Sequence, residues 1–279
     1  MSRSWVRIPL GAQIKKWSML KNQCFIFLTT NAKSYERFLK IKSCNFPGID
    51  FYYVLDVSVY SGEIPDGENV ITFNGDEVWK RWNGMIFHNK FLEYKLYCGN
   101  PQFMTIEFFN KNFGRGKDYQ YYWFCEDDIF MPNGDYYWFF KDADKVDCDF
   151  LHMKKIYDAE EDGYTAKNTI NDLKAYTNVL YESIPKPIWG KYRYWTWLMM
   201  FRISKKGCNV VNRDFKKVEG AHTELCIPSI ITNHKMTTHC MSDSDVIGYK
   251  FHIHALPLNP TFTGYENVEN TFYHPMKII

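Results

Sequence analysis

The stretch that most limits the possible folds runs from Tyr119 to Asp128, where seven mostly aromatic residues lead into three consecutive acids. A continuous apolar run of this length, rich in β-forming residues, is typical of a strand that is buried on both faces. Three carboxylates cannot be buried without partners. The strand must therefore end where Glu126, Asp127 and Asp128 begin.

The position of these acids at a strand end points to a ligand site. In open α/β sheets, the carboxyl ends of the strands border the crevice in which ligands bind. Adjacent carboxylates repel one another unless a positive charge lies between them, and a divalent cation with oxygen ligands is the natural candidate. The alternative is a solvated turn after the strand, because Asp is common in turns.

The rest of the chain repeats this alternation of strands and helices. Apolar runs predict further strands at residues 23–28, 51–55, 70–73, 148–153, 198–204 and 249–254. Helices are expected from a cap at Ser34 to about Lys42 and over residues 135–141. Strands that alternate with helices indicate an α/β fold with a mostly parallel central sheet flanked by helices.

Composition narrows the classes of function. Apolar residues make up 46% and charged residues 24%, which indicates a globular chain. A net charge of +2 argues against broad nucleic-acid binding. Aromatic residues reach 18%, more than a core of this size requires, and flat aromatic faces suit sugar rings.

Cysteine usage and hydropathy predict where the chain resides. The eight cysteines include no CxxC pair, so we expect free thiols in a reduced, cytoplasmic setting. No apolar run approaches the ~20 residues of a membrane span. Residues 1–18 are basic, without acids or periodicity, and we expect them to be a dispensable leader.

With these features together, the chain resembles glycosyltransferases of the GT-A type. That family carries an acidic motif, usually written DxD, after a buried strand, and here the motif is Glu126-Asp-Asp128. The resemblance implies one GT-A-like domain over 19–279, with a Rossmann-like nucleotide-sugar-binding half at about 19–153 and an acceptor half at about 154–279. It also implies a nucleoside-diphosphate sugar, a UDP-sugar foremost, with Mn²⁺ or Mg²⁺. Asp128 would bind the metal, while Glu126 and Asp127 would contact ribose, sugar or metal-bound water.

Two further features, an acid and the tail, fit the order of motifs in that family. Glu224, before an apolar stretch, matches the catalytic base that inverting members place at a helix start. A carboxylate of ordinary pKa, near ~4.3, is ionised at neutral pH and can accept a proton. In the tail, the resemblance implies that His274 binds the metal and Lys277 meets phosphate. The alternatives are a first-turn acid favoured by the helix dipole and an ordinary surface tail.

Aromatic and histidine patterns offer weaker candidates. Trp189, Tyr194, Trp195 and Trp197 are either core residues or a platform on which an acceptor sugar stacks. His252 and His254 have the spacing of two side chains on one face of a strand, which could suit a metal.

The sequence therefore predicts a metal-assisted, inverting glycosyltransferase that moves a sugar from a nucleotide donor to a glycan or other hydroxyl acceptor. Two alternatives remain open, a metal-dependent phosphoesterase and a carbohydrate-binding module without activity.

Overall fold

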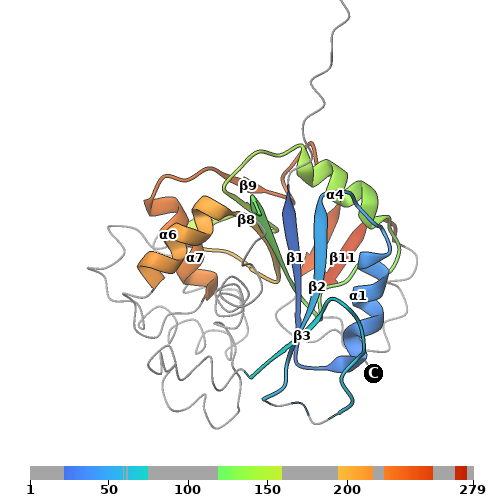
Figure 1. Cartoon of the computed structure of the whole chain (residues 1–279). Coiled ribbons are helices and arrows are strands. Elements are labelled where there is room, and N and C mark those ends of the chain that lie inside the picture. The colour runs from blue at the N-terminus through green and yellow to red at the C-terminus, as the bar shows by residue number, and fades with distance from the viewer. Residues whose placement is uncertain are drawn as a thin grey trace, which may run out of the picture.

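The computed structural model describes residues 22–58, 60, 62–74, 119–158, 194–215, 223–253 and 268–274. Within them a central sheet carries helices on both faces (Figure 1). The strands are β1 (Gln23–Thr29), β2 (Ile49–Asp56), β3 (Val70–Phe73), β4 (Tyr121–Glu126), β5 (Phe150–His152), β6 (Tyr157–Asp158), β7 (Tyr194–Trp195), β8 (Met200–Ser204), β9 (Thr238–Cys240), β10 (Lys250–Ile253) and β11 (Thr271–His274). The helices are η1 (Ala32–Ser34), α1 (Tyr35–Lys42), α4 (Tyr136–Asp144), α6 (Lys205–Phe215) and α7 (Thr223–Asn233).

The main sheet has seven strands in the order β3-β2-β1-β4-β8-β5-β9. Strands β1, β2, β3 and β4 pair in parallel, as do β5 and β9. Strand β8 runs antiparallel to both of its neighbours, β4 and β5. The prediction of a mixed α/β fold with a mostly parallel sheet is confirmed, and the sheet combines strands from both of the predicted halves of the chain.

The chain reverses its direction of travel across the sheet at β1. It moves outward from β1 to β2 and β3, and then returns to the other side of β1 as β4. In the register, Leu28 of β1 lies opposite Glu126 of β4, so both strands end at the same edge. Such a switch point is where open α/β sheets form their ligand crevice. The acids that follow β4 are at this point.

Side-chain alternation divides the core into two layers. All seven residues of β1 are buried, which explains their continuous apolar character. Cys24 and Ile26 face a layer that includes α6 and α7. Phe25 and Phe27 face the opposite layer, which includes α1 and α4. The two helix pairs lie on opposite sides of the sheet in Figure 1. None of the helices in the described parts of the chain is long and apolar enough to span a membrane.

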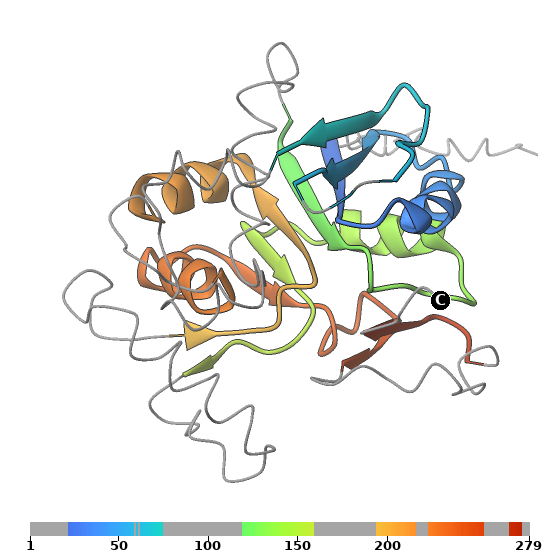
Figure 2. The same ribbon diagram turned by 90° about the horizontal axis from the view of Figure 1, so that it is seen from below.

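A second, parallel sheet of two strands, β10 and β11, extends the layer that contains α4. Phe272 of β11 packs against Phe139 of α4 with ring centroids 4.9 Å apart, and against Tyr136 at 5.9 Å. Figure 2 shows the pair of strands beside the loop that follows β4. We predicted β10 as a strand but not β11, because its four residues lack a pattern of their own.

Candidate metal centre

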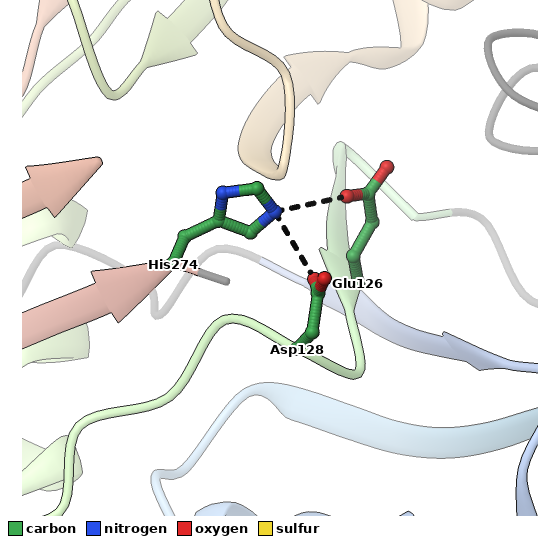
Figure 3. Close-up of side chains that lie close together, drawn as sticks. All are labelled: Glu126, Asp128 and His274. Carbon is green, nitrogen blue, oxygen red and sulfur yellow. Dashed lines mark ion pairs between the residues drawn. The ribbon is translucent and has the colours of Figure 1, made fainter. Parts of the chain in front are cut away.

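Three side chains that could hold a metal ion meet at the carboxyl end of β4: Glu126, Asp128 and His274 (Figure 3). His274 Nε2 lies 3.2 Å from Asp128 Oδ1 and 3.9 Å from Glu126 Oε2. One ligand atom from each residue lies within 4.8 Å of the other two. We call these three residues the acid–histidine cluster.

The backbone of β11 brings His274 to the acids from a distant part of the sequence. Phe130 and Tyr273 form an antiparallel bridge, in which each backbone N–H donates to the other residue's carbonyl, at 3.2 and 3.0 Å. Asn270 N–H donates to the carbonyl of Asn133 at 2.8 Å, which extends the contact. Tyr273 directly precedes His274, so the bridge fixes where the imidazole reaches the acids.

The cluster fits a cation by its chemistry and by its unsatisfied atoms. Asp128 Oδ1 and His274 Nδ1 are shielded from solvent and make no hydrogen bond within the described part of the chain. A buried polar atom without a partner is costly, and such an atom in a native fold often indicates an ion that completes the site. Two carboxylates and an imidazole are ordinary ligands for divalent metals.

Asp127 does not join the cluster, although it lies between its two acids. Thr29 Oγ1, at the end of β1, donates a hydrogen bond to the Asp127 carboxylate. The pKa of Asp127 is raised to about 6, chiefly by burial; Thr29 and Arg37 oppose the rise, and Asp128 adds to it. Glu126 ends β4, and Asp127 and Asp128 form the turn that follows it. Glu126 and Asp128 face His274, whereas Asp127 faces Thr29, so the three acids do not all face one ligand.

Asp127 is connected through Thr29 to a network of buried hydroxyl groups. Thr29 Oγ1 accepts a hydrogen bond from the backbone N–H of Asn31 at 2.8 Å. Ser34 Oγ, also buried, lies 3.0 Å from Thr29 Oγ1 and 3.0 Å from the hydroxyl of Tyr53. Burial raises the pKa of Tyr53 to about 12, so its phenol stays protonated at neutral pH. The network connects the ends of β1 and β2 to the acidic turn.

The aromatic segment proposed for the acceptor leads to the same edge of the sheet. The N–H of Glu126 donates to the carbonyl of Met199 at 2.8 Å, and Trp197 precedes Met199 by two residues. Trp197 is half-buried and packs against the core. Tyr194 is also half-buried, and its backbone N–H and carbonyl both bond to the hydroxyl of Ser229 in α7, at 2.8 and 2.9 Å.

Other predicted site residues can be placed only in part. The side chain of Trp195 is not described, and Trp189, Lys277, His254 and the leader at 1–18 lie outside the described residues. His252 is exposed on β10, where it stacks on Tyr273 with ring centroids 5.5 Å apart.

Glu224 is the second residue of α7, so the expected helix start is present there. Its side chain is not among those described. Helix α7 ends shortly before β9 begins, and β9 runs in the same direction as β4 through the intervening pairings. A helix that returns to the amino end of such a strand starts toward the carboxyl edge of the sheet. Glu224 therefore begins its helix on the side of the sheet that carries the acid–histidine cluster.

Comparison with protein-family models and with curated proteins finds no match to this chain. The functional argument therefore depends on the geometry of the site.

Proposed function

We propose that this protein is a metal-dependent glycosyltransferase of the GT-A type, with a nucleoside-diphosphate sugar, UDP-sugar foremost, as donor. The observation that carries the proposal is the acid–histidine cluster at the carboxyl end of β4, beside the switch point between β1 and β4. A nucleotide bound in that crevice would bring its diphosphate next to the cluster.

The proposed role of the cluster is to hold the cation that a diphosphate requires. Glu126, Asp128 and His274 would bind it, and the imidazole in the set favours Mn²⁺ over Mg²⁺, which prefers oxygen ligands. When bound, such an ion neutralises the charge that develops on a departing diphosphate. Lys277, as the resemblance implies, would add a further positive charge for phosphate.

Glu224 is the proposed general base. As the acceptor hydroxyl attacks the anomeric carbon, its proton passes to the Glu224 carboxylate, and the bond between that carbon and the diphosphate oxygen breaks. A carboxylate at a helix start is favoured in its ionised form by the helix dipole. A single displacement of this kind inverts the configuration of the sugar.

The proposed acceptor site is the segment that leads into β8. Tyr194 and Trp197 are half-buried there, as amphipathic rings that contact a sugar would be. Trp189 and Trp195 belong to the same stretch of sequence. Met199, at the end of this segment, accepts a backbone hydrogen bond from Glu126. An acceptor on this segment would therefore lie near the donor.

A donor-cleavage assay tests the proposal against its alternatives. The full chain is incubated with Mn²⁺ and a panel of nucleotide sugars, and released nucleotide, inorganic phosphate and sugar phosphate are quantified. We expect slow release of nucleotide from one donor. Release of inorganic phosphate or sugar phosphate would indicate a phosphoesterase, and no release from any donor would indicate a binding module.

Substitution of Glu224 tests the proposed base. Glu224→Gln keeps the size of the side chain but removes its basicity, so turnover should fall by about 10²–10⁴-fold while donor affinity stays nearly constant. Glu68→Gln, at an exposed acid after β2, is the control. Product from an α-linked donor should be β by proton NMR. An α product, or near-normal turnover of Glu224→Gln, would refute this part of the proposal.

A further inference from the structure

Arg37 of α1 contacts the acidic turn that contains Asp127 and Asp128. Its Nη1 donates a hydrogen bond to the backbone carbonyl of Asp127 at 2.9 Å. Its guanidinium carbon lies 5.3 Å from the centre of the Phe130 ring, a cation–π distance. Burial lowers the pKa of Arg37, and the nearby charges of Asp127 and Asp128 oppose that effect. The guanidinium therefore contacts the turn at two points, before and after Asp128.

We infer that Arg37 is a positioning residue for the metal centre, an inference that rests on the proposed function. The carbonyl of Asp127 is held toward α1, and the Asp127 carboxylate is held by Thr29. These contacts fix the side chain of Asp127 and the peptide unit between Asp127 and Asp128. Glu126 and Asp128 are thereby directed toward His274 of β11. Asp127 serves as the anchor of the turn.

The direction in which removal of Arg37 changes the affinity for the metal distinguishes a positioning role from a purely electrostatic one. A guanidinium near a cation site repels the cation, so an Arg37 that acted only through its charge would weaken metal binding. Its removal would then strengthen binding. A residue that orients ligands from behind has the opposite effect, because its loss typically weakens metal affinity by about 10–100-fold.

Lys40 provides a matched control on the same helix. Its Nζ lies 5.2 Å from the centre of the same Phe130 ring. It donates to the backbone carbonyl of Pro132, beyond the acids, and it is exposed. Lys40 thus shares with Arg37 the charge and the aromatic contact, but it donates to the carbonyl of Pro132 where Arg37 donates to that of Asp127.

The test is a Mn²⁺ titration of the full chain, with free Mn²⁺ followed by electron paramagnetic resonance. Wild type, Arg37→Gln and Lys40→Gln are compared at a temperature where circular dichroism shows each to be folded. We expect Arg37→Gln to weaken Mn²⁺ binding by roughly 10–100-fold and Lys40→Gln to bind like the wild type. If Arg37→Gln does not fold, Arg37→Met replaces it, because Met keeps contact with the Phe130 ring and removes the donor; the same loss is expected.

Two results would overturn the inference, and they are distinguishable. The positioning role alone would be refuted if Arg37→Gln, or Arg37→Met in its place, bound Mn²⁺ at least as tightly as the wild type does. A wild-type chain that binds no Mn²⁺ would refute the metal centre and this inference together. An equal loss in Lys40→Gln would show that general charge, and not the Asp127 contact, is responsible, and would also refute it.

Discussion

His152 gives the structure a pH-dependent stability that can be measured without knowledge of any ligand. The residue ends β5, is only 2% exposed, and stacks on Phe150 with ring centroids 5.2 Å apart. Its Nδ1 lies 2.6 Å from the carbonyl of Lys154, so that nitrogen carries the proton and donates. The pKa of His152 is lowered to about 4, chiefly by burial; the Lys154 carbonyl and Asp243 oppose the shift, and His239 adds to it.

The magnitude follows from the difference between the folded and unfolded pKa values. The folded value of about 4 is below the ordinary 6.5, so the neutral imidazole is favoured in the folded state. Stability from this group is present above pH ~6.5 and is lost as the pH falls through that value toward ~4. At about 1.4 kcal/mol per pKa unit, the loss over this window approaches roughly 3 kcal/mol.

Urea unfolding of the metal-free wild type and of His152→Asn, at about pH 7.5 and about pH 4, isolates this contribution. Asn can donate to the Lys154 carbonyl from nearly the same position as Nδ1 but does not titrate. The free energy of unfolding of the wild type minus that of the variant should be about 2–3 kcal/mol larger at the higher pH than at the lower pH. A difference that does not depend on pH, or that grows as the pH falls, would refute the reasoning.

Two other substitutions test the site and its support. Asp128→Asn should abolish the stabilisation by Mn²⁺, which for a bound ligand reaches about 2.7 kcal/mol at a concentration of 100 times Kd. The shift in melting temperature on addition of Mn²⁺ measures this stabilisation. Glu36→Gln, at an exposed acid of α1, is the control and should show the same shift as the wild type. Phe272→Ala removes a ring that is 2% exposed and packs on α4, so unfolding in urea should show a loss of about 3–5 kcal/mol. Val268→Ala, at a 38% exposed position, should change stability by less than about 0.5 kcal/mol. Equal losses in the two variants would contradict the packing role of β11.

The central strands could be predicted from sequence because burial on both faces leaves an uninterrupted apolar run. Strands β1 and β4 have this character, whereas β3 lies at the edge of the sheet and exposes Thr72. The observed bounds of β1, β2, β3 and β4 lie within a few residues of the predicted ones. The direction of β8 could not be predicted. Its apolar run indicates a strand, but an antiparallel strand between β4 and β5 is specified by pairings across the sheet.

Two elements were not predicted from the sequence. Helix α6 was missed although Cys208, Val210 and Val211 pack on one core layer and make the helix amphipathic; Gly207, in its first turn, is unfavourable in a helix. Strand β11 depends on β10 and on the bridge to Phe130, which are distant in sequence. Phe272 and Tyr273 of this strand are buried, which argues against the alternative of an ordinary surface tail at these residues.

The position of the acids in the site could be predicted from the residues themselves, whereas that of His274 was predicted only from the resemblance. The change from apolar residues to acids at Glu126 places the carboxylates at a strand terminus on physical grounds. Nothing local to His274 indicates that it meets them, because the bridge between Phe130 and Tyr273 is a tertiary contact. The separate orientation of Asp127 could not be predicted, because it depends on the turn after β4 and on a hydrogen bond from Thr29 of β1, which is distant in sequence.

The insertion of β8 between β4 and β5 has a consequence for biosynthesis. Among the described strands, β5 pairs with β8 and β9, so neither of these partners is available as the chain emerges from the ribosome until β8 has been made. A nascent chain that reaches residue 153 therefore carries one unpaired edge on β4 and an isolated β5, and exposed edges promote pairing with other chains. Vectorial synthesis completes the cluster later still, when His274 appears, so a nascent or prematurely terminated chain lacks the imidazole of the metal centre.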